Sequence, residues 1–129
     1  MEINKPLEGI KVVEISTIVT ASLATMMMSD QGAEVIKIEQ KGIGDPMRYL
    51  GTQKGGTSAL FANCNRGKSS IDLDLKNNED LEIARRLIQE ADVLINNFRP
   101  GVMEGLGLSH EECKNLNESL IYVSINGFG

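Results

Sequence analysis

Four cations stand at positions of this sequence where an anion could bind. They are Lys41, Arg48, Lys76 and Arg99, each in a polar turn that follows a strand-like run. The stretch "INNFRPGVMEGLG" is the most informative, because an apolar run ends in two asparagines and a Phe-Arg-Pro-Gly turn then leads into a helix-forming segment. Backbone N–H groups at a helix start favour an anion such as a phosphate when a cation is nearby. The alternative interpretation is that these are ordinary solvated cations on an acidic protein.

Few other side chains have the chemistry of a catalytic centre. Asp72 and Asp74 alternate in "IDLDL", so they share one face of a strand, which we interpret as solvated or facing a loop. Asp45 lies between Gly and Pro, where aspartate normally stabilises a turn. His110 is the single histidine and directly follows a predicted helix cap, as an exposed first-turn residue would. We therefore expect no catalytic residue within this chain.

The composition limits the classes of partner. A chain of 129 residues is the size of one domain, and its net charge of −5 disfavours nucleic acid as a partner. No apolar run approaches the roughly 20 residues that cross a bilayer, and "MEINKPLEG" has no leader-like pattern, so we expect no membrane partner and a cytoplasmic location. Cys64 and Cys113 lack the paired spacing of a zinc site and are too few for a disulfide framework. Both are expected to be reduced, and no bound metal is expected.

Predicted strands alternate with predicted helices along the chain. The β-branched and apolar runs predict strands over 10–16, 33–40, 69–75, 92–98 and 119–127. The helical patterns cover 21–31, 77–91, a short segment after Gly101, and 109–116, where Ser109 and Glu112 fit a capping box. The weakly patterned stretch 49–63 is predicted to be a loop with at most one helical turn. This order predicts an α/β fold with a doubly wound, mainly parallel sheet, covered by helices on both faces, that binds ligands at the carboxyl ends of its strands.

Two common nucleotide motifs are absent from the sequence. There is no GxxxxGK[ST], and the first predicted strand is followed by "TIVTASLA", which contains no glycine. An ordinary NAD or ATP enzyme is therefore disfavoured. A receiver-like signalling domain is disfavoured as well, because Ser16 and Thr17 stand where it would need clustered aspartates.

Five ordered blocks resemble a known family. They are "LEGIKVVEIS", "GAEVIKIEQKGIGDPMR", "NRGKSSIDLDLK", "ADVLINNFRPGVMEGLGLS" and "LNESLIYVSINGFG". Together they resemble the N-terminal part of the class III CoA-transferases, which are the carnitine dehydratase and bile-acid-inducible family and include the α-methylacyl-CoA racemases. The resemblance runs from about Leu7 to the last residue.

The resemblance implies that residues 1–129 form a Rossmann-like domain that binds the adenosine and phosphate end of coenzyme A. By motif position, the implied contacts are Leu73, Lys76, Asn97, Phe98, Arg99 and Gly101. The residue types suit that role, because Arg99 could pair with a phosphate through two bonds, Lys76 could act as a point charge, and Gly101 would let the backbone approach closely. The same role is expected, on weaker grounds, for Arg48.

The sequence departs from the family pattern at three places. Ala21-Ser22 stands where relatives often have Gly-Pro, and Asn96 replaces the glutamate of the common "ENFRPG". Gly105 occupies a position that is basic in many members, so one phosphate contact is expected to be missing. The loop of Thr17 to Thr20 is expected to place the ligand differently from relatives.

The resemblance also implies a longer architecture whose C-terminal portion is absent here. In the transferases a downstream aspartate attacks the acyl-CoA thioester, and CoA moves between carboxylic acids through an aspartyl intermediate. In the racemases a downstream histidine and aspartate exchange a proton instead. The expected partners are acyl-CoA, an acceptor carboxylic acid, and a second subunit in an interlocked homodimer, whereas this chain alone is expected to be inactive. A racemase fragment and a stand-alone CoA-binding or nucleotide-binding module remain alternatives, and the acyl substrate is open.

Overall fold

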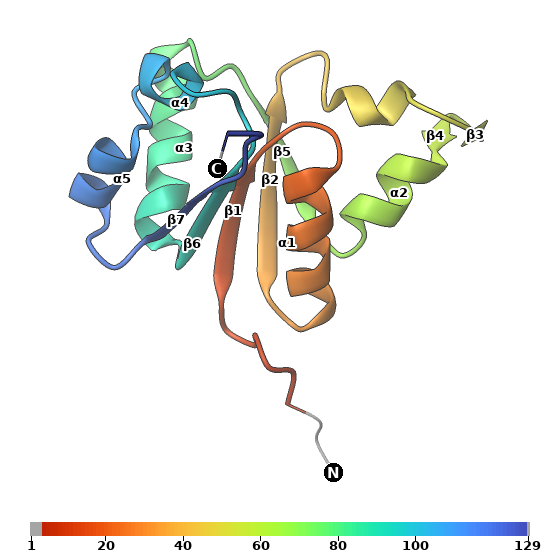
Figure 1. Ribbon diagram of the computed structural model, residues 1–129, viewed down its shortest axis with the longest axis horizontal. Coiled ribbons are helices and arrows are strands. Elements are labelled where there is room, and N and C mark those ends of the chain that lie inside the picture. Colours follow the sequence, from red (N-terminus) through yellow and green to blue (C-terminus); the bar gives the residue numbers. More distant parts are fainter. Residues whose placement is uncertain (1–3, 129) are drawn as a thin grey trace.

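The structure, a computed structural model, describes residues 4–128 and contains a five-stranded sheet (Figure 1). The strands lie in the order β5-β2-β1-β6-β7 and every neighbouring pair is parallel. Their bounds are Lys11–Ile15 (β1), Glu34–Gln40 (β2), Ser69–Leu73 (β5), Val93–Asn96 (β6) and Ile121–Ser124 (β7). The predicted α/β, doubly wound fold is confirmed, and the order changes direction beside β1, as in Rossmann-like sheets.

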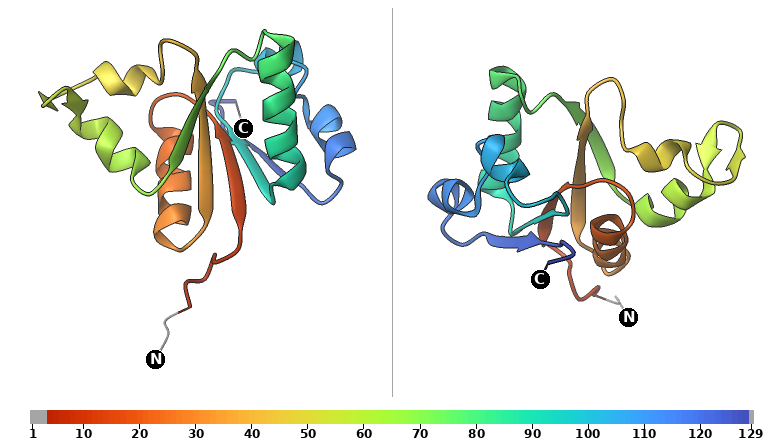
Figure 2. Two further views of the ribbon diagram at one scale, coloured as in Figure 1. Left: turned by 180° about the vertical axis from the view of Figure 1, so that it is seen from behind. Right: turned by 45° about the horizontal axis from the view of Figure 1, so that its top comes forward.

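Helices cover both faces of the sheet (Figure 2). One face carries α1 (Thr20–Asp30), with α2 (Ala59–Asn65) packed beside it. The other face carries α3 (Asn78–Glu90), α4 (Val102–Gly105) and α5 (His110–Leu116). Burial on both sides explains why the central strands are nearly continuous apolar runs.

Two apolar cores follow from the alternation of side chains along each strand. Val13 points to the α3 side and packs with Ala84, Ile88 and Leu94, whereas Val12 points to the α1 side. The α3 core is the larger, and it also takes in apolar residues of α4 and α5. This larger core positions the turn after β6 against the ends of β1 and β5.

The segment after β2 is more regular than predicted. It contains a 3₁₀ helix η1 (Pro46–Tyr49), a small antiparallel hairpin of β3 (Gln53–Lys54) and β4 (Thr57–Ser58), and then α2. The predicted loop over 49–63 is therefore wrong for the hairpin and for the helix that starts at residue 59. Only Cys64 of α2 is buried, so the helix has no apolar periodicity to detect. The missed signal was Ser58, whose hydroxyl caps the helix by accepting from the Phe61 N–H at 3.3 Å.

The capping box at the start of α5 is confirmed. The Ser109 hydroxyl accepts from the Glu112 N–H at 3.1 Å, and the Glu112 carboxylate accepts from the Ser109 N–H at 3.0 Å. The predicted strand over 119–127 is shorter, since only Ile121–Ser124 pairs with β6. Between residues 4 and 128, no helix combines the length and the apolar character that crossing a bilayer demands.

Candidate functional site

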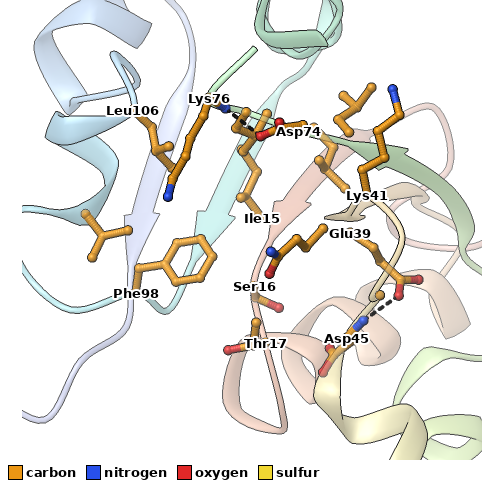
Figure 3. Close-up of a pocket in the computed structure, with 16 residues that line it drawn as sticks. Ile15, Ser16, Thr17, Glu39, Lys41, Asp45, Asp74, Lys76, Phe98 and Leu106 are labelled. Atoms are coloured by element: carbon orange, nitrogen blue, oxygen red, sulfur yellow. Dashed lines mark hydrogen bonds between the residues drawn. The ribbon is translucent and has the colours of Figure 1, made fainter.

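A cavity of about 550 Å³ opens at the carboxyl ends of β1, β2 and β5 (Figure 3). Phe98, from the turn after β6, closes one side together with Val102 and Leu106 of the α4 segment. This is the edge of the sheet at which parallel α/β folds bind their ligands.

The wall of the cavity combines an apolar floor with charged side chains. The apolar contributors include Ile15, Ile38, Leu73, Phe98 and Leu106. The charged contributors are Glu39, Lys41, Asp45, Asp74 and Lys76. Figure 3 shows Lys76 and Phe98 on one side of the cavity, with Glu39 and Asp45 on the opposite side. Such a wall can hold an apolar ring system while a nearby cation meets a negative group of the same ligand.

The structure brings three of the predicted site residues into this cavity. Leu73, Lys76 and Phe98 line it, although they come from two segments, the end of β5 with its following turn and the turn after β6, that are more than twenty residues apart in the chain. Leu73 is almost fully buried at the end of β5, whereas Lys76 is exposed in the turn that follows. Asn97, Arg99, Gly101 and Arg48 do not line the cavity, and their ligand contacts remain predictions.

Asn97 holds the loop that follows β1. Its side-chain oxygen accepts from the Thr17 N–H at 3.0 Å, and its amide nitrogen donates to the Thr17 carbonyl at 2.6 Å and to the Thr20 hydroxyl at 3.0 Å. All three contacts reach about eighty residues back along the chain. Sequence reasoning identified this asparagine as a ligand contact, and the structure gives it a role in positioning the cavity wall.

Replacing Asn97 by alanine is expected to destabilise the folded chain by about 1–2 kcal/mol, because the Thr17 amide and carbonyl lose their partners. Urea unfolding followed by circular dichroism measures this change. Asn115→Ala, at an exposed position of α5, is the matched control and is expected to change stability by less than about 0.5 kcal/mol. Equal effects of the two substitutions would contradict this role of Asn97.

The backbone conformation at position 101 explains why this residue is a glycine. Its φ is +91°, and it is the residue that precedes the first turn of α4. A side chain is strained in this conformation, so glycine is favoured here whether or not a ligand approaches. Arg99, two residues earlier, is exposed, and within residues 4–128 its guanidinium forms no ion pair.

Arg48 is engaged by a buried carboxylate. Its guanidinium donates to Glu39 through two bonds of 2.8 and 2.7 Å and lies 3.9 Å above the centre of the Phe61 ring. Glu39 also accepts from the Ser70 hydroxyl and from the Asp45 N–H, each at 2.7 Å. Burial by itself would raise the pKa of Glu39, but these four bonds outweigh it and lower the pKa to about 2. The Arg48 guanidinium is therefore already paired with Glu39. A phosphate that contacted Arg48 would have to share the guanidinium with this carboxylate.

A buried charge network, which the sequence reasoning missed, borders the cavity and shares Asp45 with its wall. Glu14 is at its centre and pairs with Lys37 at 2.6 Å and with Lys68 at 2.7 Å, while Lys37 also lies 2.9 Å from Asp45. The side chains of all four residues are at most 2% exposed. Glu14 accepts in addition from the hydroxyls of Ser16, Ser22 and Thr25. Two carboxylates and two ammonium groups thus form a charge-balanced cluster that joins β1, α1, β2 and the start of β5.

Electrostatics in this network favour the charged form of Glu14. Burial opposes ionisation, but the charges and hydrogen bonds of Lys37 and Lys68 outweigh it and lower the pKa of Glu14 to about 2. Burial also lowers the pKa of Lys68, and the charge of Glu14 works against that effect. The sequence held a signal for this pair, since Glu14 interrupts the apolar run 12–15 and Lys37 interrupts the apolar run 35–38. Glu14 and Lys37 are direct neighbours in the register of β1 and β2.

Cys64, Cys113 and His110 are the remaining titratable side chains that the sequence singled out. Cys64 and Cys113 are buried and unpaired as thiols, and burial raises the pKa of Cys113 to about 11, so it stays protonated. His110 is exposed and its ring lies 5.3 Å from that of Tyr122. Among the described residues, no group of three His, Cys, Asp or Glu side chains is arranged to hold a metal ion.

Comparison with known proteins identifies relatives along almost the whole chain. The sequence matches CoA-transferase family III over residues 7–129. It is 43% identical to the acetyl-CoA:oxalate CoA-transferase of Acetobacter aceti over 96% of this chain and 32% of that protein. It is 37% identical to the human succinyl-CoA:glutarate CoA-transferase over 97% of this chain and 29% of that protein.

Solved structures agree with these matches. A CAIB/BAIF family protein from Brucella suis superimposes with a TM-score of 0.91 and 43% identity, covering 98% of this chain and 35% of that one. Rv3272 from Mycobacterium tuberculosis gives a TM-score of 0.90 and 37% identity, with coverage of 97% and 35%. The chain therefore spans about a third of the length of the relatives it matches.

Proposed function

Because the chain belongs to CoA-transferase family III, we propose that it is the N-terminal part of an acyl-CoA transferase and that this part binds the nucleotide end of coenzyme A. The observation that carries the proposal is the cavity at the carboxyl edge of the sheet, where Leu73, Lys76 and Phe98 come together. The family resemblance implies nucleotide contacts at these three positions. Their convergence on one cavity supports a common ligand.

The wall of the cavity suits the two chemical halves of the nucleotide. The adenine ring would lie on the apolar floor beside Phe98, which offers a flat face for stacking. Lys76 would meet a phosphate as a point charge. Arg99 directly follows Phe98 in the chain, does not line the cavity and is exposed, so its planar guanidinium would be available for a phosphate that extends beyond the cavity.

The names of the relatives support a role for this part in handling CoA and not the acyl group. The two curated relatives described above are named for different acids, oxalate and glutarate, and both are named for CoA transfer. A unit that resembles both is suited to the portion of the substrate that they share. Other parts of the enzyme would accordingly select the acyl substrate.

In the complete enzyme, an aspartate outside this chain would attack the acyl-CoA thioester, release the CoA thiolate and form an aspartyl intermediate. The thiolate would attack this intermediate at the aspartyl carbonyl and release the donor carboxylate. The acceptor carboxylate would next displace CoA from the aspartyl thioester, and the CoA thiolate would take the acceptor acyl group from the resulting anhydride, which frees the aspartate. The enzyme would work in the cytoplasm as an interlocked homodimer, and the present chain would supply binding without turnover. The relatives named above are transferases, so we propose a transferase in preference to a racemase.

Calorimetric titration of coenzyme A into the 129-residue chain tests nucleotide binding. Saturable binding is expected, and Arg99→Ala or Lys76→Ala is expected to weaken it about tenfold, which is typical for loss of one charged contact. Dephospho-CoA distinguishes a contact to the 3′-phosphate from one to the diphosphate. Arg86→Ala is the matched control, because Arg86 is exposed on α3 and does not line the cavity. A folded chain that does not bind coenzyme A would contradict the proposal.

A further inference from the structure

The loop between β1 and α1 contains an unusual backbone conformation. Ile18 has a φ of +63°, and among residues 4–128 it is the only residue other than glycine with a positive φ. A β-branched side chain is disfavoured there because its Cβ crowds the following carbonyl. The Ile18 side chain is also 42% exposed, so apolar burial does not account for the conformation. Other contacts must hold the loop.

Asp45 supplies one of those contacts. Its Oδ1 accepts from the Ile18 N–H at 3.0 Å, and the same oxygen accepts from the Met47 N–H at 2.9 Å. Asp45 is 1% exposed, so water does not compete for this oxygen. The preceding residue, Thr17, is held on both its N–H and its carbonyl by Asn97. Two side chains from distant segments thus fix two successive residues of the loop.

Asp45 is itself held from two directions. Its Oδ2 lies 2.9 Å from the Lys37 ammonium in an ion pair that lacks hydrogen-bond geometry, and Lys37 is fixed in turn by Glu14 at 2.6 Å. The Asp45 N–H donates to Glu39 at 2.7 Å. Asp45 therefore joins the buried charge network to Glu39, the carboxylate that pairs with Arg48. A carboxylate fixed in this way can hold a strained backbone, because it loses little freedom when it accepts the bond.

The loop and Asp45 together form one section of the cavity wall. Ser16 and Thr17 line the cavity from the end of β1, and Gly44 and Asp45 line it from the segment after β2. Figure 3 shows Ser16, Thr17 and Asp45 next to one another on this wall. If the loop relaxed to an ordinary conformation at Ile18, Thr17 would move and the wall would change shape.

We propose that Asp45 is a positioning residue that holds the loop of Thr17 to Val19 in its strained conformation and so preforms this wall for the ligand. That the ligand is coenzyme A rests on the proposed function. The benefit is preorganisation, because a wall already in its bound conformation costs no ordering on binding. A buried aspartate outside the catalytic chemistry would then set the affinity of the nucleotide site.

Amide hydrogen exchange, followed by NMR without ligand, tests the positioning directly. The Ile18 amide is expected to be protected in the wild-type chain although its side chain is exposed, and Asp45→Ala is expected to remove that protection. Exchange of the wild-type Ile18 amide at the rate of a free peptide would overturn the proposal. This arm remains decisive if Asp45→Ala fails to fold or if coenzyme A proves not to be the ligand.

A glycine at position 18 separates positioning from general stability. Asp45→Ala is expected to weaken coenzyme A binding at least about tenfold, and Ile18→Gly in the same chain is expected to restore affinity to within about threefold of wild type. The reason is that glycine adopts a positive φ without the carboxylate. If Asp45 only stabilised the fold, a neighbouring glycine would not restore binding. Failure of rescue in a folded double variant would therefore overturn the proposal.

No coenzyme A binding by the folded wild-type chain would contradict the proposed function and would leave the exchange measurement to decide the role of Asp45. The two proposals thus fail by different observations.

Discussion

Replacing Glu14 by glutamine is expected to destabilise the folded chain by about 3–5 kcal/mol. The glutamine keeps the shape of the side chain but removes the anion at the centre of the buried network. Lys37, whose side chain is 1% exposed, would keep Asp45 as its remaining carboxylate, whereas Lys68, at 2% exposed, would lose the carboxylate with which it pairs. An uncompensated buried ammonium group is costly because neither water nor a counter-charge solvates it.

Urea unfolding at neutral pH, followed by circular dichroism, measures this loss. Glu34→Gln is the matched control, since Glu34 is an exposed glutamate at the start of β2, and a change below about 0.5 kcal/mol is expected. If Glu14→Gln lay within about 1 kcal/mol of wild type, the network would not be a main source of stability.

Acidification is expected to remove a comparable amount of stability. The pKa values of Glu14 and Glu39 are lowered from 4.5 to about 2 in the folded chain. A carboxyl with a lowered folded pKa binds protons more readily when unfolded. The contribution of such a carboxyl to the free energy of unfolding is therefore fully present above the unfolded pKa of 4.5 and is lost as the pH falls through about 2. At about 1.4 kcal/mol per pKa unit, each of the two contributes on the order of 3 kcal/mol.

The free energy of unfolding should therefore fall steeply between about pH 5 and pH 2. Urea titrations at several pH values measure this slope, and Glu14→Gln provides an internal comparison. That variant lacks one of the two carboxyls, so its stability should depend less on pH in this window. A flat profile for the wild-type chain from about pH 6 to pH 3 would contradict the ionised, paired state of both carboxylates.

Local signals in the sequence were sufficient for most of the fold. The β-branched runs identified all five strands of the parallel sheet, and the amphipathic pattern after residue 77 identified α3. Ser109 and Glu112 marked the start of α5 because the capping box is a contact between residues three apart. The hairpin and α2 were missed because these short elements bury few apolar side chains, and periodicity is the signal on which prediction depends.

The candidate site could be predicted in part. The rule that ligands bind at the carboxyl ends of parallel strands, together with the motif positions, led to Leu73, Lys76 and Phe98, and these residues do share a cavity. Motif position could not separate them from Asn97 and Arg48, whose side chains are engaged by Thr17 and by Glu39. A motif identifies residues that matter without showing whether they contact a ligand or hold the residues that do.

The sequence alone was enough to predict the order of strands and helices along the chain and the edge of the sheet at which a ligand would bind. It was also enough to identify the family resemblance. Those properties depend on neighbours in the chain or on blocks read in order. The partners of Glu14, Asp45 and Asn97 emerged only from the tertiary structure, because their contacts join residues up to 80 positions apart. Which buried carboxylate meets which cation, and which amide it holds, is decided by the packing of strands and loops that brings those positions together.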